Sequence, residues 1–480
     1  MNQYDVIVVG CNSSSLISAL SLMVDGYKVL LIDKHSTIGD LTKNNRLGRF
    51  KIEDTLHNLY INYSNYNYSL SKILDRCGIK NTTSYVEIDN LCSIKVEDKL
   101  YTLPIGIDKF INYLESKIKG SKDKLIKLFE LGKIVRDTMD YIVTHINNIN
   151  YKYIKKDFNN VCNFTVEEGF KYVGINGTLK KVLDRLCIYY GSESSSLSFV
   201  EYLSFLVNVI DKGVCISKDS DDSLFNLLLH EYTKKNGLVR LNTNVVSLII
   251  EDGSINGVRL STGEVLYAQR VVVSNDIKNV YENMIQASDV PRIALKHLNQ
   301  REEGTKVFSV HLGLNRSFEE LKLSEYMYLL TDNMIVVVHN NAYKYISEDG
   351  TSLISIYYLL KDNKFVNGVD KKNYYYFEID KMTKKIIKEF QDSLDIEIYD
   401  YIEEIKVVTP FDNNKVFEYK KNINESLLAK ILNSNNERYI KGLYVCEGLN
   451  GDVYGYGSSF ISGLGPSNYF KNEGDFNEKN

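Results

Sequence analysis

The first 33 residues constrain the fold of this 480-residue chain more than any other segment. The run Val6–Val9 is apolar and β-branched and ends at Gly10, which is typical of a fully buried strand in a parallel sheet. A helical stretch follows as far as Gly26, and a second strand-like run, Lys28–Asp33, ends in an acid. Together these segments predict one βαβ unit of the dinucleotide-binding type, and therefore the α/β fold class.

The helix of this unit carries its own start signal. Ser13, Ser14 or Ser15 can cap its N-terminus, because a serine hydroxyl accepts a hydrogen bond from a backbone N–H of the first turn. Apolar residues at helical spacing then predict one apolar face that packs on the sheet. These residues are Leu16, Ile17, Leu20 and Met23.

Asp33 stands where a dinucleotide-binding fold needs an acid. It follows Gly10 by 23 positions, close to the spacing of roughly 20 at which a carboxylate meets the ribose hydroxyls of an adenine dinucleotide. The glycine fingerprint G-x-G-x-x-G is incomplete, because Asn12 and Ser15 replace its second and third glycines. Asn and Ser permit the turn, but Asn12 adds bulk where the pyrophosphate approaches the backbone. An occupied dinucleotide site and an ordinary βαβ unit both remain open.

The later part of the chain predicts a second region of mixed helices and strands. A strand pair is expected in Leu91–Leu103, and further strands in Val307–Leu312, Met334–His339 and Ser352–Leu359. Helices are expected in Ile107–Leu131, Gly169–Tyr190, Ser195–Val209 and Tyr374–Phe390.

Composition and charge exclude several classes of function. A net charge of -4 and a pI of about 6.1 give no overall attraction to nucleic acid. The 7 Cys form no C-x-x-C pair, and the 7 His include no i, i+4 pair, so no metal site is predicted. Scattered cysteines of this kind indicate reduced, mostly buried thiols and a cytoplasmic location. No apolar run approaches the 18 or so residues of a membrane-spanning helix, which leaves peripheral membrane contact open.

Beyond Asp33 the chain resembles the FAD-dependent family of phytoene desaturases, carotenoid isomerases and retinol saturases. That family is related more distantly to amine oxidases and to Rab GDP-dissociation inhibitors, and the resemblance covers nearly the whole chain. Thr165–Leu224 fits the family without an obvious gap, and Thr409–Pro410 matches its late T-P turn. The other segments that carry the resemblance are Asp33–Asp40, which resembles E-K-x-x-x-x-G-G, Gly48–Leu59, which resembles G-x-x-F-E-x-G-x-H-x-L, Asn242–Val245, which resembles N-T-x-V, Val273–Asn275, which resembles V-S-N, and Gly442–Gly463, which resembles the closing strand, flavin loop and helix.

The resemblance implies a Rossmann-like FAD/NAD(P)-binding domain interleaved with an α+β substrate domain. The implied cofactor domain consists of residues 1–90, 210–280 and 436–471, and the substrate or cap domain of 91–209 and 281–435. Residues 472–480 are expected to be a disordered tail. The implied activity is transfer of hydride between FAD and the carbon skeleton of a small, lipophilic substrate held in a closed tunnel.

The family's cofactor positions carry over onto this chain residue by residue. The resemblance makes Val245 the adenine contact and assigns no catalytic residue. The full set of implied cofactor-binding residues is Gly10, Asn12, Ser14, Ser15, Asp33, Lys34, Gly39, Asp40, Val245, Glu447, Gly448, Gly457 and Ser458.

Departures from the family pattern gather around this one cofactor. Asp40 replaces a glycine, Glu447–Gly448 inverts the family's Gly-Asp, and Ser458 stands where a glycine usually faces the flavin. Extra carboxylates repel a dianionic pyrophosphate, whereas Lys34 and backbone amides can attract it. Two hypotheses therefore stay open. One is an FAD enzyme, which either oxidises or reduces its substrate or uses reduced FAD for isomerisation. The other is a cofactor-free binding or scaffold protein, paired with an active homologue as its protein partner.

Overall fold

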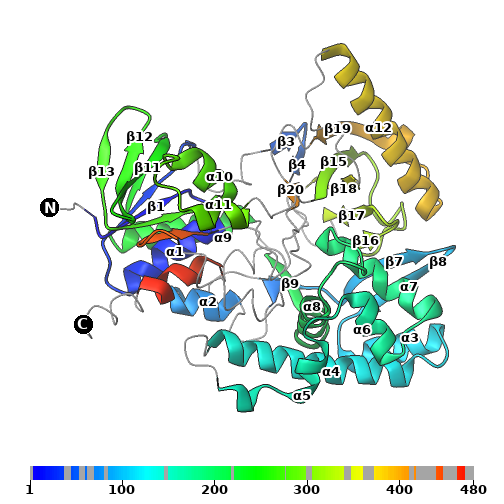
Figure 1. The fold of residues 1–480 in the computed structure, drawn as a ribbon. Coiled ribbons are helices and arrows are strands. Elements are labelled where there is room, and N and C mark those ends of the chain that lie inside the picture. Colours follow the sequence, from blue (N-terminus) through cyan, green and yellow to red (C-terminus); the bar gives the residue numbers. More distant parts are fainter. Residues whose placement is uncertain are drawn as a thin grey trace.

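The computed structural model describes residues 4–36, 45–52, 60–61, 70–80, 85–144, 150–217, 221–275, 277–298, 305–339, 347–360, 372–409, 416–417, 439–446 and 462–470. Within these ranges two large sheets organise the chain (Figure 1). One is parallel and the other mixed. The parallel-sheet lobe and the mixed-sheet lobe are named after them below.

The parallel sheet confirms the predicted βαβ unit and the α/β class. Its strand order is β10-β2-β1-β14-β21, and every neighbouring pair is parallel. The bounds are β1 Val6–Val9, β2 Val29–Ile32, β10 Leu238–Arg240, β14 Arg270–Val273 and β21 Leu443–Val445. Because the strands are buried on both faces, their sequences are continuous apolar runs instead of alternating ones.

Each face of the parallel sheet has its own cover (Figure 1). Helices α1 Ser13–Val24, α2 Leu70–Arg76, α9 Asp221–Lys234 and the helix 462–470 share one apolar cluster with the sheet. On the other face lies an antiparallel sheet of β11 Val245–Glu251, β12 Ser254–Leu260 and β13 Val265–Tyr267. Beside it are α10 Ile277–Asn279, the single π turn η3 Val280–Met284 and α11 Arg292–Leu298.

Two expectations for α1 were wrong. The N-cap is Asn12, not a serine, because the Asn12 side chain accepts the hydrogen bond from the backbone N–H of Ser15. The helix also lacks a single apolar face, since every residue of Ser13–Leu22 is buried. Helices 462–470 and α9 cover the sides that the sheet does not. Three of the buried serines, Ser15, Ser18 and Ser21, donate to backbone carbonyls, and Ser18 does so to Gly463 O at 2.9 Å.

The mixed sheet has eight strands in the order β19-β15-β18-β17-β16-β7-β8, with β20 beside β15. All its pairs are antiparallel except β16–β7. The bounds are β7 Asn90–Val96, β8 Lys99–Pro104, β15 Thr305–Leu314, β16 Met327–Leu329, β17 Met334–Val338, β18 Ser352–Leu360, β19 Ile402–Val408 and β20 Val416–Phe417. The strand pair and the three later strands expected from the sequence are therefore confirmed.

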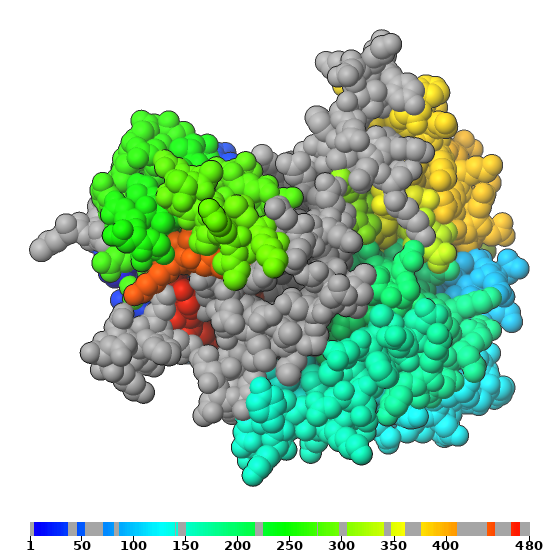
Figure 2. All heavy atoms as spheres, in the orientation of Figure 1, coloured from blue at the N-terminus to red at the C-terminus, as the bar shows by residue number. Residues whose placement is uncertain are grey.

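Helices cover the mixed sheet on both sides. The long helix α12, Lys372–Leu394, packs on one face. On the other side lie α3 Ile107–Lys117, α4 Lys122–Thr144, α5 Lys156–Val161, α6 Val166–Val173, α7 Gly177–Arg185 and α8 Phe199–Lys212, joined by short turns η1 Tyr151–Tyr153 and η2 Leu186–Tyr190. The turn η5 Tyr399–Tyr401 leads into β19. In the space-filling view α3–α8 form one continuous body, and α12 lies far from the parallel-sheet lobe (Figure 2).

Short strands connect the two lobes. β9, Val214–Ser217, pairs with β5 Tyr60–Ile61 and β6 Tyr85–Glu87. The hairpin of β3 Asn45–Leu47 and β4 Phe50–Ile52 follows the βαβ unit in sequence but packs on the mixed sheet. Its contacts there are described with the site. The predicted domain boundaries stay a prediction, as does the disorder of residues 472–480, which lie outside the described ranges.

Candidate cofactor-binding site

Gly10 forms the turn between β1 and α1. Its φ of +108° lies in the region that favours glycine. A Cβ added there would lie 3.2 Å from the Cβ of Ser274, which follows β14. Glycine therefore lets the ends of two neighbouring parallel strands come close together, at the sheet edge where α/β folds bind their ligands.

The Asn12 side chain joins the start of α1 to the end of β14. Its Oδ1 accepts the Ser15 backbone N–H at 3.0 Å and the Ser14 hydroxyl at 2.9 Å, and its Nδ2 donates to the Ser274 hydroxyl. The Ser14 and Ser274 hydroxyls are themselves 2.8 Å apart. This network, called the Asn12 latch below, therefore lies across the helix N-terminus.

The α1 N-terminus keeps the character of an anion site beneath the latch. The first hydrogen bond of the helix runs from Leu16 N to Asn12 O, so the helix backbone does not use the N–H groups of Asn12, Ser13 and Ser14. The helix dipole adds positive potential at this end, which favours a phosphate.

Asp33 connects the end of β2 to the same turn. One carboxylate oxygen accepts the Cys11 backbone N–H at 2.7 Å. The other accepts the His35 backbone N–H at 2.7 Å and lies 2.9 Å from His35 Nδ1. The side chain is 7% exposed. A carboxylate oxygen has two acceptor sites, so the oxygen that accepts the Cys11 N–H keeps capacity for a ribose hydroxyl.

The remaining predicted residues fall into two groups. Val245 begins β11 and is buried in the cluster that contains Ile7 and Ile32, while Lys34 is exposed. The backbone N–H of Thr243 donates to Asp33 O at 2.8 Å, so the chain that leads to Val245 runs beside the end of β2. The others lie outside the described residues: Gly39, Asp40, Glu447, Gly448, Gly457 and Ser458.

The closing helix, 462–470, begins against α1. A Cβ on Gly463 would lie 2.5 Å from Ser14 O and 2.9 Å from Ile17 Cβ, so only glycine permits this approach. The resemblance led us to expect a closing helix near the flavin, and the structure places its start at the first turn of α1. The described residues therefore fit the adenosine and pyrophosphate end of a dinucleotide.

Disulfides, metal-ligand clusters and membrane-spanning helices also bear on the chemistry that the described residues can perform. All seven cysteines are unbridged, and six are buried. Among the described residues, no three His, Cys, Asp or Glu gather as metal ligands, and no helix is long and apolar enough to cross a membrane.

The sequence did not reveal a buried polar cluster in the mixed sheet. His311 Nδ1 and His339 Nε2 both lie 2.7 Å from the hydroxyl of Ser355. The sequence contained one signal that could have indicated this cluster, which is a polar residue at an inward position in or directly after each of three buried strands. Spacing along the chain could not show it, because antiparallel pairing brings these residues together.

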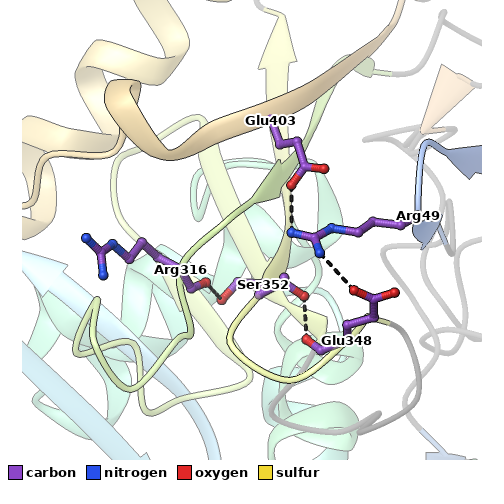
Figure 3. Close-up of polar contacts among 6 residues, drawn as sticks. Arg49, Arg316, Glu348, Ser352 and Glu403 are labelled. Atoms are coloured by element: carbon purple, nitrogen blue, oxygen red, sulfur yellow. Dashed lines mark hydrogen bonds and ion pairs between the residues drawn. The ribbon is translucent and has the colours of Figure 1, made fainter.

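An ionic contact outside the cluster fixes the β3–β4 hairpin to the mixed-sheet lobe. Arg49 extends between two carboxylates, with one nitrogen 2.8 Å from Glu348 and another 2.8 Å from Glu403 (Figure 3). Nearby, the Ser352 hydroxyl donates to the Arg316 carbonyl at 2.7 Å. The ion pairs are partly exposed, so they orient the hairpin more than they stabilise it.

The fold defines a class: two-lobed α/β proteins with a Rossmann-like parallel sheet and a mixed sheet. No family model matches the chain. It is 22% identical over 340 residues to the 4,4'-diapophytoene desaturase (4,4'-diapolycopene-forming) of a Methylomonas species, a match that covers 66% of this chain and 62% of that protein. The chain is thus a distant homologue of phytoene desaturases.

Three solved structures share the fold over almost the whole chain. An oxidoreductase from Methanosarcina mazei has a TM-score of 0.65 at 13% identity, over 96% of this chain and 99% of that one. Putrescine oxidase bound to putrescine gives 0.63 at 10% identity, over 97% and 98%. Rab GDI from Plasmodium falciparum gives 0.51 at 14% identity, over 97% of each. The fold is therefore the one shared by FAD-dependent oxidoreductases and GDI-like proteins.

Proposed function

We propose that this protein is an FAD-dependent oxidoreductase that moves hydride between the flavin and the carbon skeleton of a small, lipophilic substrate. The observation that carries the proposal is the bond from Cys11 N–H to Asp33, 2.7 Å long. This bond holds the carboxylate that would bind the ribose beside the helix N-terminus that would bind the pyrophosphate. Distant homology to desaturases supports the type of chemistry.

The chain's own residues have limited tasks in this proposal. When bound, FAD supplies the hydride chemistry. The amides of Asn12 and Ser14 would bind phosphate, and Asp33 would orient the ribose. The mixed-sheet lobe would hold the substrate away from water. We also propose a cytoplasmic location, which is consistent with the unbridged cysteines, and no nucleic-acid partner. Contact with a membrane surface is part of the proposal, because it would deliver a lipophilic substrate.

A second candidate is a cofactor-free relative that binds a protein partner, such as an active homologue. The Asn12 latch favours it, because donors and acceptors near the phosphate position already satisfy one another. A phosphate must displace the latch or bind beside it. The GDI-like fold is consistent with a binding role.

Flavin binding separates the two candidates. The natively purified protein is examined by visible absorbance, then denatured to identify any released chromophore, and titrated with FAD. A flavin band of about one per chain supports the enzyme. A folded, colourless protein that does not bind added FAD overturns it and favours the partner-binding role.

Matched variants test whether the binding uses the proposed residues. Asp33→Asn is expected to weaken FAD binding by about tenfold or more, equivalent to about 1.4 kcal/mol. Asp5→Asn is its control, because Asp5 accepts the Lys28 backbone N–H at 2.7 Å near the opposite end of the same strand pair. Asn12→Gly removes the latch and is expected to strengthen FAD binding. Equal affinity in all these variants would place the flavin elsewhere.

A further inference from the structure

The centre of the mixed sheet contains three polar residues from three adjacent strands. His311 is in β15, Ser355 is in β18 directly opposite it, and His339 follows β17. All three are 0% exposed. In Figure 1 these strands lie side by side between α12 and the rest of the molecule. We call the three residues the histidine–serine cluster.

The cluster faces away from α12. Residues of β15 that alternate with His311, such as Val310 and Leu312, belong to the apolar cluster that includes α12. Gly313 shares the face of His311, and a Cβ on it would lie 2.4 Å from the Phe50 ring. The histidine–serine cluster therefore lies on the face that the β3–β4 hairpin covers.

One hydroxyl between two imidazoles sets a strict rule for protons. A serine hydroxyl has one proton to donate, and a neutral imidazole has one donor and one acceptor nitrogen. With both rings neutral, one ring must donate to Ser355 Oγ while Ser355 donates to the other. Either ring can be the donor, so two hydrogen-bonded arrangements exist. They differ in the tautomer of both rings. When the cluster carries one extra proton, the cationic ring donates to Ser355 Oγ and Ser355 donates to the neutral ring. A shift of both protons along the line of His311, Ser355 and His339 then moves the positive charge from one ring to the other.

A second positive charge in the cluster is disfavoured. Protonation of both rings would leave Ser355 with two donors and place two cations in the sheet interior. Lys406 lies directly opposite His311 on β19 and opposes a charge there, whereas Glu404, opposite Gly313, is one further position away. The Tyr357 ring lies edge-on to the His311 ring, with the two ring centroids 6.0 Å apart. The two rings are therefore expected to take up one proton, not two.

Packing alone does not require these polar groups. Several neighbours on the same face are apolar, including Val337, Leu353 and Leu359, although Ser309 is also buried there. Replacing a buried polar cluster by apolar residues of similar size is often neutral or stabilising. A purely structural role is thus a weak reason for two imidazoles and a hydroxyl at this position.

We propose that His311, Ser355 and His339 form a buried acid–base relay that holds a single exchangeable proton and passes it between β15 and β17. In each transfer an N–H bond on the protonated ring and the Ser355 O–H bond break, while a new O–H bond and an N–H bond on the neutral ring form, so the positive charge moves to the other ring. No electrons are gained or lost. Since the cluster is fully buried, these are relay residues and not groups that touch a substrate.

The use of the relay rests on the proposed function. When a C–C single bond becomes a double bond, one carbon loses a hydride and its neighbour loses a proton. A flavin is the hydride acceptor in the proposed reaction, and the proton needs a path through an apolar interior. The relay would be part of that path, and in the reverse direction it would return the proton.

Imidazole ¹⁵N NMR of the full-length chain tests the relay directly, because protonated and bare ring nitrogens have separate resonances. His311→Gln and His339→Gln assign the signals. In the wild type the two rings are expected to change together as the pH is lowered and to take up one proton between them. Uptake of one proton by each ring at its own pH would overturn the proposal.

Variants of Ser355 provide the second readout. Ser355→Ala is expected to abolish the coupling, so that each ring keeps one fixed tautomer, while Ser355→Thr retains a hydroxyl and is expected to retain it. Ser309→Ala is the control, because Ser309 is buried on the same face two residues from His311. Identical imidazole ¹⁵N signals in the wild type and Ser355→Ala would contradict the relay. If Ser355→Ala does not fold, the wild-type titration decides.

The two proposals can fail separately. The NMR experiment needs no flavin, so a protein without FAD that shows the coupled rings keeps the relay and loses only its proposed use. Conversely, a normal flavin band with uncoupled rings keeps the proposed function and removes the relay. Ser355→Ala is expected to leave the flavin spectrum unchanged.

Discussion

The two sheets of this protein place their polar side chains differently. In the parallel sheet the strand interiors are apolar, and Asn12, Asp33 and Ser274 lie just beyond the carboxyl ends of the strands. In the mixed sheet His311 and Ser355 lie in the middle of the strands. Polar groups at strand ends can exchange protein partners for a ligand, whereas those in a sheet interior must be matched by groups on neighbouring strands.

This difference follows from strand topology. Parallel strands bring their carboxyl ends to one edge, where turns and helix N-termini supply unpaired backbone donors. Antiparallel strands place long runs of residues opposite one another, so a polar residue in one strand must be matched by its neighbours. The first arrangement suits binding of a ligand, and the second suits transfer within a fixed network.

The packing of the β3–β4 hairpin on the mixed sheet should show the largest effect on stability. Phe50→Ala is expected to lower the free energy of unfolding by about 3–5 kcal/mol, the usual cost of removing a buried Phe ring. Phe50 is fully buried and packs against Gly313 on the face that carries the histidine–serine cluster. Urea unfolding measures the change, with Leu100→Ala on exposed β8 as control, expected within about 0.5 kcal/mol. A loss below about 1 kcal/mol would mean that the hairpin and mixed sheet do not depend on each other.

The turn at Gly10, between β1 and α1, should show the next largest effect on stability. Gly10→Ala is expected to lower the free energy of unfolding by about 2–3 kcal/mol. It places an alanine at a positive φ and brings its Cβ close to Ser274. Gly26→Ala is the matched control, since Gly26 also has positive φ but no atom lies within 4 Å of its added Cβ. It should cost about 1–2 kcal/mol. Equal losses, measured by urea unfolding, would show that the close approach of β1 and β14 is unimportant.

These two sites also show what sequence can predict. The Gly10 turn, both flanking strands and the position of Asp33 follow from adjacent residues, since a βαβ unit is local. The Asn12 cap was wrongly assigned to serine, because Asn and Ser have nearly equal cap preferences and only the distant Ser274 distinguishes them. The histidine–serine cluster depends on pairing between strands 16 and 44 residues apart. Strand existence was predictable there, but register was not.

Removing one buried tyrosine hydroxyl from each lobe is expected to have a smaller effect on stability. Tyr232 of α9 donates within 3.0 Å of both Val29 O and Leu238 O, and so joins β2 to β10. Tyr202 of α8 donates to Leu183 O alone, at 3.0 Å. Tyr232→Phe is expected to cost about 1–1.5 kcal/mol and Tyr202→Phe about 0.5–1 kcal/mol. Thermal unfolding of both variants measures the difference, and the reverse order would contradict the link between β2 and β10.

The smallest expected effect depends on pH and concerns Glu325, which accepts two hydrogen bonds from Asn90 Nδ2, at 3.1 and 3.3 Å. Burial raises the pKa of Glu325, Asp89 raises it further, and Asn90 opposes the shift. The folded state therefore binds the proton more tightly than the unfolded state does. It loses stability as the pH rises above the ordinary glutamate pKa of about 4.3 and through the higher folded pKa.

Glu325→Gln removes this penalty while it keeps an acceptor for Asn90. The variant is expected to be more stable than the wild type at pH 7, by less than about 1 kcal/mol, and the advantage should shrink as the pH falls toward 4. Glu320→Gln is the contrasting control. Hydrogen bonds from the Ser317 backbone N–H and the charge of Arg316 lower the pKa of Glu320, so its replacement should reduce stability at neutral pH. Melting curves of both variants from pH 4 to 8 give the two signs. Parallel curves for wild type and Glu325→Gln would mean that the Glu325 carboxylate is solvated in the folded state, and would contradict the raised pKa.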